Sequence, residues 1–276
     1  MNNKEIDQHF GQDIPVVIFC GGQGTRMRGG SATKKELVEI GGRPIIWHVM
    51  RIYSSFGFNR FILPLGYEAQ QIKSYFLHYE AMSRNFTIEV GQRKNRVTYH
   101  GEEAHPEWQV SLVDTGLHTE KASRLVKIAD YIKAKRFFLT YGDGVGDINI
   151  QAVLDFHLAH EKLVTITAVQ PHHYQYGTME ADINGQVSLY EQYPRLPYWI
   201  NAGFMVFETA ALQQIQNGDD TALETGVLQE MIRQDQVMMF RHHGFWQSMD
   251  TLKDATELEE IWQQGAPWKT WENNKR

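Results

Sequence analysis

A glycine-rich segment with nearby cations is the strongest chemical signal in the sequence. It reads Phe19-Cys20-Gly21-Gly22-Gln23-Gly24-Thr25-Arg26, and it follows the apolar run Ile14 to Phe19. A buried strand that ends in glycines exposes several backbone N–H groups, and the missing side chains let a phosphate approach the main chain closely. Arg26 and Lys35 would supply the positive charge. The segment therefore predicts a loop that binds the phosphates of a nucleotide.

Two common phosphate motifs do not fit this spacing. A Walker loop needs the pattern G-x-x-x-x-G-K-[ST], and the dinucleotide fingerprint needs a third glycine at the position of Met27. A glycine-rich turn with solvated basic residues is the alternative interpretation, because isolated glycine motifs often have no function.

Two aspartates are the candidate metal ligands. Asp143 lies between glycines after an apolar run, and Asp250 ends the stretch Phe245 to Asp250. Magnesium prefers oxygen ligands and is usually held by one or two carboxylates together with substrate phosphates. Each aspartate also has an ordinary interpretation, as a turn residue or as the N-cap of a following helix. Combined with a glycine loop and two cations, they indicate metal-assisted phosphoryl or nucleotidyl transfer.

Covalent catalysis is not indicated by the sequence. The pairs His172-His173 and His242-His243 lack the i, i+4 spacing of helical metal ligands, so these residues are interpreted as ordinary histidines. Cys20 is the single cysteine, which excludes an intramolecular disulfide framework and a cysteine-based zinc site. It is expected to be a small buried residue in a reducing cytoplasm.

The composition is that of an ordinary globular protein. The 276 residues are 42% hydrophobic, and 27 basic against 33 acidic residues give a formal charge of −6. This balance argues against a broad surface for nucleic acid or an anionic membrane. No apolar run approaches the roughly 18 residues that a membrane span needs. We therefore expect a cytoplasmic protein whose phosphate binding is local.

Alternating apolar runs and helical patterns predict an α/β fold. The runs Val16 to Cys20, Phe61 to Leu65, Arg136 to Tyr141 and Leu163 to Val169 predict strands, and Ile45 to Phe56 and Ala122 to Ile132 predict helices. Continuous apolar runs are typical of strands that helices cover on both faces, so a three-layer, Rossmann-like fold with a mixed, mainly parallel sheet is expected. In such sheets ligands bind beyond the carboxyl ends of the strands, where the glycine loop and Asp143 both lie.

The chain is expected to form one domain over residues 13–276, after an N-terminal tail of residues 1–12, because no Pro/Gly/Ser-rich linker divides it. The stretches Phe86 to Ser111 and Met179 to Glu191 look like β insertions on the ligand side. The tryptophan-rich segment Trp262 to Trp271 is expected to pack on the body or on a neighbouring subunit; an exposed aromatic platform is the alternative.

Taken in order, several motifs resemble those of the glucose-1-phosphate cytidylyltransferases, a branch of the sugar-phosphate nucleotidyltransferases. The likeness covers almost the whole chain after Gln12. It rests on Gly21 to Arg26, Val38 to Ile45, Leu112-Val113-Asp114-Thr115-Gly116, Tyr141 to Val145, Phe245 to Thr251 and Ala266 to Glu272. Such enzymes join CTP to a sugar 1-phosphate, release pyrophosphate and use Mg²⁺, and they suggest a homo-oligomer.

The resemblance also implies roles for individual residues. It implies Arg26, Lys35, Asp143 and Asp250 as catalytic residues, with the two aspartates on the metal. It implies a nucleotide site made of Phe19, Cys20, Gly21, Gly22, Gln23, Gly24, Thr25, Arg26, Thr119, Arg124 and Gly142. It implies an acceptor site that includes Gly177, Glu191 and Asn201.

The acceptor side departs from the family pattern. The family's Lys-Pro-Lys-Pro appears as Thr33-Lys34-Lys35-Glu36, its Thr-Gly-Gly-Arg as Lys121-Ala122-Ser123-Arg124, and its Glu-Lys-Pro as Glu191-Gln192-Tyr193-Pro194. A lysine expected to contact the sugar phosphate is therefore missing at Gln192. Either Arg195 substitutes for it or the acceptor differs.

These observations favour an enzyme that transfers a nucleotidyl group from CTP to a sugar 1-phosphate such as glucose 1-phosphate. A cytidylyltransferase for another phosphorylated acceptor, sugar or not, and an inactive nucleotide-binding protein are the alternatives. Backbone N–H groups that bind phosphates do not read the base, so the preference for cytosine rests on the resemblance alone. The acceptor phosphate has a second pKa near ~6 and needs no protein base, which fits the absence of a catalytic histidine.

Overall fold

The computed structural model describes residues 14–22, 33–91, 96–101, 107–170, 177–192, 198–215 and 222–273. Its strands are β1 (Val16–Phe19), β2 (Glu39–Ile40), β3 (Arg43–Pro44), β4 (Arg60–Leu65), β5 (Asn85–Glu89), β6 (Arg96–His100), β7 (Gln109–Asp114), β8 (Arg136–Tyr141), β9 (Gly144–Gly146), β10 (Val164–Val169), β11 (Thr178–Ala181), β12 (Val187–Glu191), β13 (Ile200–Asn201), β14 (Met205–Glu208), β15 (Val237–His242) and β16 (Trp246–Ser248).

The helices are α2 (Ile45–Ser54), α3 (Ala69–Leu77), α4 (Tyr79–Ser83), α5 (Lys121–Lys127), α6 (Ala129–Ile132), α7 (Ile150–His160), α8 (Leu228–Arg233), α9 (Leu252–Gln263) and α10 (Thr270–Asn273). Three shorter turns are the 3₁₀ turns η2 (Lys35–Leu37) and η3 (Thr209–Gln214) and the π-helical turn η4 (Leu223–Val227). Among the described residues, none of the helices is both long and apolar enough to span a membrane.

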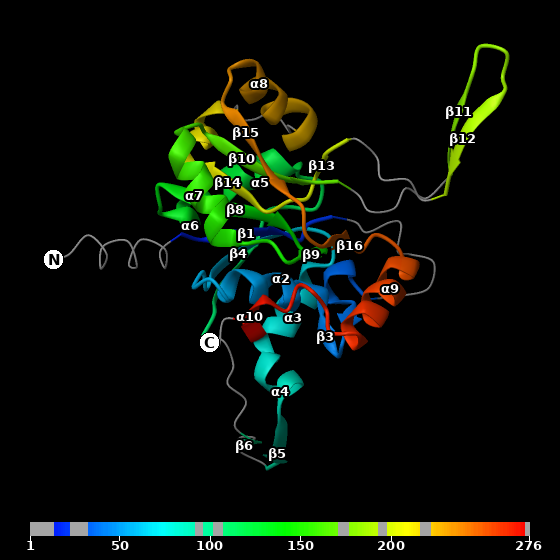
Figure 1. Cartoon of the computed structure of the whole chain (residues 1–276). Helices are drawn as coiled ribbons and strands as arrows, with labels where there is room; N and C mark the ends of the chain where they lie inside the picture. Colours follow the sequence, from blue (N-terminus) through cyan, green and yellow to red (C-terminus); the bar gives the residue numbers. More distant parts are fainter. Residues whose placement is uncertain are drawn as a thin grey trace.

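An eight-stranded sheet forms the middle layer of the molecule (Figure 1). Strands β8, β1, β4 and β7 lie side by side and run parallel. Strand β14 joins β8 to β10 in antiparallel pairs, and β15 pairs with β10 in parallel. The mixed, mainly parallel sheet and the α/β fold predicted from the sequence are therefore confirmed.

Residues of β1 alternate between the two faces of the sheet. Val16 and Ile18 belong to one buried cluster with α2, whereas Val17 and Phe19 belong to a second with α5. Apolar side chains of β1 are removed from water on both faces of the sheet, so the strand is held from two sides. This central strand can therefore hold the loop that follows it.

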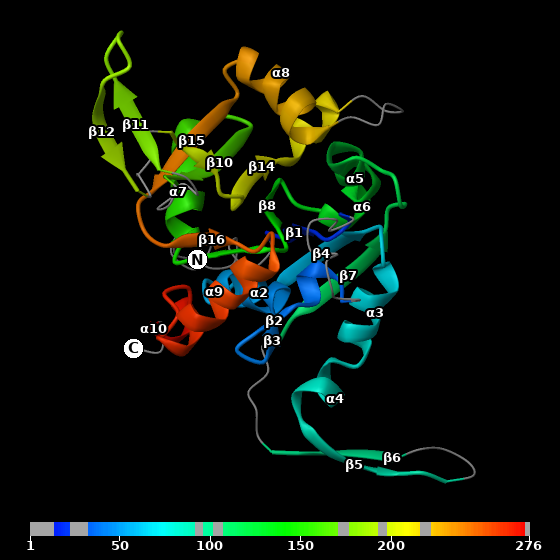
Figure 2. The same cartoon turned by 90° about the vertical axis from the view of Figure 1, so that its right-hand side faces the viewer.

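The two predicted insertions form separate two-stranded antiparallel hairpins, β5–β6 and β11–β12. Figures 1 and 2 show that they project from the body in different directions. The helix predicted from Ala122 to Ile132 is interrupted at Ile128, where α5 ends and α6 begins. The predicted tail of residues 1–12 lies outside the described residues.

Candidate active site

Three charged side chains from distant parts of the chain meet at the carboxyl end of the sheet. The Lys35 ammonium Nζ lies 2.7 Å from Asp143 Oδ2 and 2.7 Å from Asp250 Oδ1. Lys35 begins η2, Asp143 follows β8, and Asp250 precedes α9. The two carboxylates predicted to share a metal therefore face one positive group. Because both oxygens contact the same nitrogen, the distance between the two oxygens is at most the sum of these two distances.

Asp250 lies directly before α9 and is held by the first turn of that helix, but it is not the N-cap. Thr251 is the N-cap: its hydroxyl accepts from the backbone N–H of Asp254, and the Asp254 carboxylate accepts from the backbone N–H of Thr251. Asp254 Oδ2 also accepts from the backbone N–H of Asp250, at 2.8 Å. The alternative interpretation of Asp250 as an N-cap is therefore wrong, because a hydroxyl one residue later has that role, and the Asp250 carboxylate binds Lys35.

Asp143 is held by the backbone on both sides of it. The Gly142 N–H donates to the carbonyl of Phe19 at 3.3 Å, and the Asp143 carbonyl accepts from Met249 N–H at 2.8 Å. A Cβ at position 142 would lie 2.9 Å from the Glu36 side chain, so this position has room for glycine alone unless Glu36 moves. Close packing of β8 against β1 and of β9 against β16 thus fixes the direction of Asp143.

Lys35 is charged in this environment. Burial by itself would lower its pKa, but the charges of Asp143 and Asp250 and their hydrogen bonds outweigh burial and raise the pKa above its ordinary value. The Lys35 side chain is 12% exposed, whereas those of Asp143 and Asp250 are 28% and 43% exposed. A soluble phosphate could therefore reach this cluster, where it would meet a permanent cation.

A buried ion pair next to Lys35 could not be predicted from the sequence. Lys34 Nζ lies 3.4 Å from Glu36 Oε2 and also donates to the carbonyl of Gly22, at 3.2 Å. Burial raises the pKa of Glu36, partly offset by Lys34. These residues replace the two family prolines of this motif. A lysine and a glutamate at these positions suggest a solvated surface. Instead, the Lys34 side chain connects the η2 turn to the glycine segment, and the Lys34 backbone N–H donates to Gln71 Oε1 at 2.9 Å.

Two of the predicted nucleotide residues, Gly21 and Thr119, are connected with a third, Arg124. Its guanidinium donates to the Leu65 carbonyl at 2.9 Å and to the Thr115 hydroxyl at 2.6 Å. A Cβ on Gly21 would lie 2.5 Å from Arg124 Cζ. The absence of a side chain at Gly21 therefore allows the Arg124 guanidinium to lie directly against the main chain. Thr119 donates to the Thr115 carbonyl at 2.7 Å. Gly21, Thr119 and Arg124 therefore line one end of the sheet together.

Cys20 is buried and free, as expected from the sequence. Burial, with a smaller effect from the Glu36 charge, raises the pKa of its thiol well above the ordinary value. A thiol in this state is a poor nucleophile, which fits the prediction that Cys20 is a filler beside the site. Phe19 is likewise buried, and its carbonyl binds Gly142.

Of the three predicted acceptor residues, Asn201 lies in the main sheet, and Gly177 and Glu191 lie beside or in the β11–β12 hairpin. Asn201 in β13 pairs with Ala168 in β10, and its side chain bonds that of Tyr141, which is two residues before Asp143. Thr178 and Glu191 face each other across the β11–β12 hairpin, which places Gly177 near Glu191. Asn201 is thus connected to the charged cluster, whereas no contact joins Gly177 or Glu191 to Lys35 among the described residues.

A second charged group, also missed by the sequence analysis, surrounds Tyr141. Its hydroxyl donates to Glu224 Oε1 at 2.8 Å, Lys121 binds the same carboxylate oxygen, and Lys121 Nζ lies 4.8 Å from the centre of the Tyr141 ring. Glu224 belongs to the π-helical turn η4, and such turns often occur at functional sites. Nothing in the local sequence marks Glu224, because its contacts come from segments far away in the chain.

Some predicted residues cannot be placed. Gln23, Gly24, Thr25, Arg26 and Arg195 lie outside the described residues. Gln192, at the position of the missing family lysine, accepts from the Tyr190 hydroxyl at 2.6 Å. Within the described ranges, no group of three or more histidine, cysteine, aspartate or glutamate side chains could hold a metal. Among the described residues, a metal at this site would find the two carboxylates of Asp143 and Asp250.

A comparison with known families decides the classification. The family model described as nucleotidyl transferase matches residues 15–264. The chain belongs to the nucleotidyl transferase family. The chain is 42% identical to the glucose-1-phosphate cytidylyltransferase of Salmonella typhi over 94% of its length and 100% of the relative. It is 34% identical to a probable glucose-1-phosphate cytidylyltransferase of Bacillus subtilis (strain 168), again over 94% of its length and 100% of the relative.

Solved structures agree with this nucleotidyl transferase fold. HddC from Yersinia pseudotuberculosis superposes with a TM-score of 0.64 at 19% identity, covering 90% of this chain and 99% of that one. The inositol-1-phosphate CTP transferase from T. maritima has a TM-score of 0.60 at 15% identity, covering 91% and 96%. The family match and the 42% identity to a glucose-1-phosphate cytidylyltransferase confirm the resemblance stated from the motifs, while the roles of individual side chains stay predictions.

Proposed function

We propose that this nucleotidyl transferase joins CTP to glucose 1-phosphate, giving CDP-glucose and pyrophosphate. The observation that supports it most directly is the convergence of Asp143 and Asp250 on Lys35, beside the glycine segment predicted to bind phosphates. Identity of 42% over nearly the whole chain to a glucose-1-phosphate cytidylyltransferase supports the choice of both substrates.

In the reaction, a phosphate oxygen of the acceptor attacks the α-phosphorus of CTP. A new P–O bond forms, the bond between the α-phosphorus and the bridging oxygen breaks, and pyrophosphate leaves with that electron pair. A phosphomonoester with a second pKa near ~6 is already largely ionised at neutral pH, so the protein need not remove a proton. Its task is to position the phosphates and to neutralise their charge.

Lys35 is the best placed cation for this task among the described residues. Its raised pKa keeps the ammonium protonated, so it stabilises negative charge on the phosphates and does not act as a base. Its two carboxylate partners and the Lys34–Glu36 pair fix its position before substrate binds. A positioned charge of this kind costs no reorganisation during the reaction.

The pair of carboxylates fits Mg²⁺. That ion prefers oxygen ligands and commonly takes one or two carboxylates with water and substrate phosphates, and the described part of the site offers two carboxylates on converging side chains. We infer that Asp143 and Asp250 would hold it. When bound, Mg²⁺ would neutralise part of the triphosphate charge. The two aspartates would hold the ion, and the Lys35 ammonium would supply further positive charge beside it.

The test is release of pyrophosphate by the purified protein with Mg²⁺. CTP, UTP, dTTP and ATP are each combined with glucose 1-phosphate, and CTP is then combined with mannose 1-phosphate, inositol 1-phosphate and other phosphorylated acceptors. We expect the largest kcat/KM for CTP with glucose 1-phosphate. A preference for another nucleotide would contradict the choice of base, and a preference for another phosphorylated acceptor would contradict the choice of glucose 1-phosphate. Absence of release with every pair, despite CTP binding, would contradict the activity.

A further inference from the structure

An ion pair outside the Lys35 cluster lies where β8 ends. The Lys121 ammonium binds Oε1 of the Glu224 carboxylate, and the Tyr141 hydroxyl donates to the same oxygen at 2.8 Å. The side chains of Lys121 and Glu224 are 43% and 37% exposed, so a ligand in solution can reach both of them. Neither residue belongs to the predicted nucleotide, metal or acceptor site, so this accessible pair has no role in the account so far.

Predicted nucleotide residues lie next to this pair on both segments that position it. Lys121 begins α5 and is three residues before Arg124, so the two side chains lie on one side of that helix. Arg124 packs directly against Gly21 in the glycine segment. Tyr141 ends β8, and the centre of its ring lies 6.2 Å from that of Phe19. The pair therefore lies beside the segment predicted to bind the nucleotide.

Three elements hold the Glu224 carboxylate in place. Glu224 lies on η4, which contacts α5, and it binds Lys121 of α5 and Tyr141 of β8. Burial alone would raise the pKa of Glu224, but its bonds with Lys121 and Tyr141 outweigh burial and lower the pKa below its ordinary value. The carboxylate is therefore ionised at neutral pH. Both of these bonds use Oε1, so neither of them occupies the acceptor positions of Oε2.

The charges of the pair favour a neutral part of the nucleotide over a phosphate. Glu224 balances the positive charge of Lys121, and a phosphate at this place would also meet the negative carboxylate. A hydroxyl group, by contrast, can donate to a carboxylate and accept from an ammonium. In dinucleotide-binding folds a carboxylate commonly accepts from a ribose hydroxyl. The two neighbouring hydroxyls of a ribose therefore match both members of the pair.

We propose that Glu224 and Lys121 bind the 2′- and 3′-hydroxyls of the nucleotide's ribose, with Glu224 accepting and Lys121 donating. Tyr141 is a positioning residue, because it holds the Glu224 carboxylate without contacting the nucleotide. The proposal rests on the proposed function, since it names residues that bind the nucleotide of that reaction. It makes this pair the determinant by which the enzyme selects a ribonucleotide over a deoxyribonucleotide.

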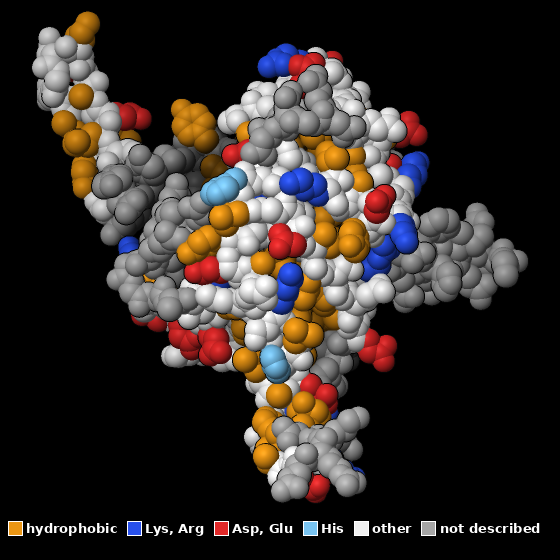
Figure 3. All heavy atoms as spheres, turned by 180° about the vertical axis from the view of Figure 1, so that it is seen from behind, with side chains coloured by type: hydrophobic (Ala, Val, Ile, Leu, Met, Phe, Trp, Pro, Cys, Tyr) orange, Lys and Arg blue, Asp and Glu red, His pale blue; other side chains and the backbone are white. Residues whose placement is uncertain are grey.

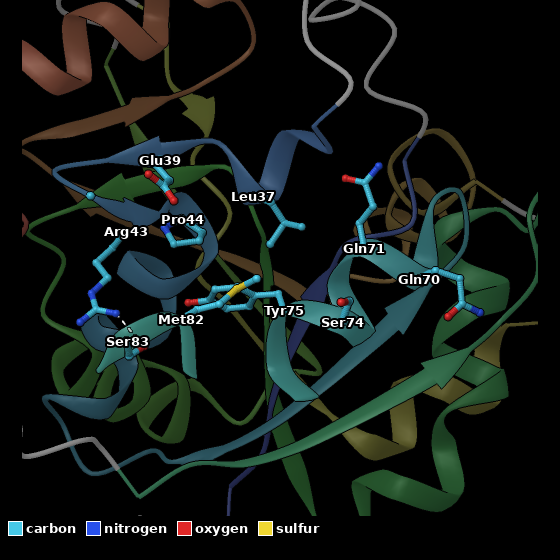
Figure 4. A pocket seen from close by; sticks show the side chains of 11 residues that line it. Leu37, Glu39, Arg43, Pro44, Gln70, Gln71, Ser74, Tyr75, Met82 and Ser83 are labelled. Carbon is cyan, nitrogen blue, oxygen red and sulfur yellow. Dashed lines mark hydrogen bonds between the residues drawn. The ribbon is translucent and has the colours of Figure 1, made fainter. Parts of the chain in front are cut away.

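A groove on the opposite face of the sheet provides a control position. The groove has a volume of about 460 Å³ and lies between the β2–β3 hairpin, η2, α3 and α4 (Figure 4). Ile72 of α3 belongs to the buried cluster on one face of the sheet, whereas Leu125 of α5 and Val227 of η4 belong to the cluster on the other. Gln70 lines the groove and is exposed, so its substitution should not affect ribose binding.

Calorimetric titration with CTP, 2′-deoxy-CTP and 3′-deoxy-CTP in the presence of Mg²⁺ tests the proposal. Wild type should bind at least one deoxynucleotide about tenfold more weakly than CTP, the effect of losing one hydrogen bond to a charged group. Glu224→Ala should weaken CTP binding and bring the affinities for CTP and that deoxynucleotide to within about twofold, because the bond is then absent for both. Gln70→Ala, and Glu230→Ala at an exposed position on α8, should keep the wild-type ratio.

Lys121→Met is the second test variant, because it removes the charge but keeps a long side chain. It should also lower the ratio, and it decides the test if the melting temperature shows that Glu224→Ala does not fold. The proposal is overturned if wild type binds all three nucleotides equally, or if either folded variant keeps the wild-type ratio. Absence of pyrophosphate release by a wild-type protein that still binds CTP more tightly than its deoxy forms would contradict the proposed reaction and support the ribose site.

Discussion

Lys35 is the residue on which the proposed chemistry depends most. Its ammonium lies between two carboxylates and is kept charged by them. Lys35→Ala should lower kcat by about 100-fold, the typical effect of removing one group that stabilises transition-state charge, and should raise the KM for CTP much less. Single-turnover kinetics measure the chemical step directly.

The matched control is Lys253→Ala, which removes an exposed lysine of α9 close in sequence to Asp250. It should retain the wild-type rate. An unchanged chemical step in Lys35→Ala would remove Lys35 from the mechanism and leave its ion pairs with a structural role.

Gly21 permits the close approach of Arg124 to the main chain. Gly21→Ala places a methyl group 2.5 Å from Arg124 Cζ and should displace the bonds to Leu65 and Thr115. We expect a loss of about 1–3 kcal/mol in the free energy of unfolding, since buried polar groups lose partners, and at least tenfold weaker CTP binding. Gly22→Ala is the control for stability, because a Cβ there meets nothing within 4 Å. Equal melting temperatures for the two variants would contradict the close approach.

Asp143, Asp250 and Lys35 could be identified from the sequence as candidate site residues. Turns or helix caps can explain each carboxylate alone, but they rarely explain carboxylates and cations that occur together near strand ends. The sequence could not indicate the buried Lys34–Glu36 pair, the Gln71 contact to Lys34, or the Tyr141–Glu224–Lys121 group. These contacts join residues that are far apart in the chain or that look like surface residues, and residue type alone does not show which polar side chains become buried.

At the scale of secondary structure, the start of α9 fixes Asp250, one of the two carboxylates proposed to hold Mg²⁺. Asp254 accepts from the backbone N–H groups of both Asp250 and Thr251, each at 2.8 Å. Asp254→Ala should cost about 1 kcal/mol in the free energy of unfolding, as loss of a capping contact does, and should lower kcat severalfold because the backbone of Asp250 is less constrained.

Thermal unfolding and steady-state rates check this prediction together. Glu260→Ala, at an exposed position on the same helix, is the control for helix composition and should change neither quantity appreciably. If Asp254→Ala destabilised the protein but kept the wild-type kcat, the cap would stabilise α9 without positioning Asp250.

The central strands were the most predictable elements. The apolar runs at β1, β4, β8 and β10 are continuous because helices cover both faces, so their positions were predicted to within a residue. The break between α5 and α6 at Ile128 was not predicted, because the apolar spacing continues through it. The pairing of β14 between β8 and β10 also depends on contacts that no local pattern specifies.

Over the whole molecule, the C-terminal tryptophans close one face of the body, as expected from the sequence. Trp262, Trp268 and Trp271 surround His48 on α2, with ring centres 4.9, 6.1 and 6.3 Å away. Trp268 is fully buried, so its role is packing. The Trp268 indole N–H donates to His48 Nδ1 at 3.3 Å, which leaves Nε2–H to donate to the Ile40 carbonyl at 2.8 Å.

This arrangement predicts a loss of stability in mild acid. Burial lowers the pKa of His48 to about 4, and burial similarly lowers that of His157 to about 4. The unfolded chain, with an ordinary histidine pKa near ~6.5, binds protons first as the pH falls, so stability decreases from about pH 6.5 to about pH 4. Each histidine contributes up to about 1.4 kcal/mol per pH unit within that window.

Denaturant unfolding of wild type and His48→Gln at several pH values measures this contribution. Glutamine can both donate to Ile40 and accept from Trp268 but does not titrate, so the variant should show a shallower pH dependence. His157 and His160, whose pKa values burial also lowers, contribute to the remainder. The same slope in both proteins would show that His48 does not contribute to the acid sensitivity.

The expected homo-oligomer stays a prediction at this scale. Figure 3 shows apolar side chains along the projecting hairpins, where Met179, Val187 and Leu189 of β11–β12 are 65%, 54% and 48% exposed. An isolated two-stranded hairpin is marginally stable in water, and exposed apolar surface of this kind is common at protein interfaces.

The most direct test of the account is the rate of pyrophosphate release from CTP, glucose 1-phosphate and Mg²⁺ by wild type, Asp143→Asn, Asp250→Asn and the double variant. If the two carboxylates act together beside Lys35, each single variant should lose nearly as much activity as the double variant, and each should need more Mg²⁺ for half-maximal rate. Wild-type rates in either single variant, or losses that multiply in the double variant, would contradict a shared site.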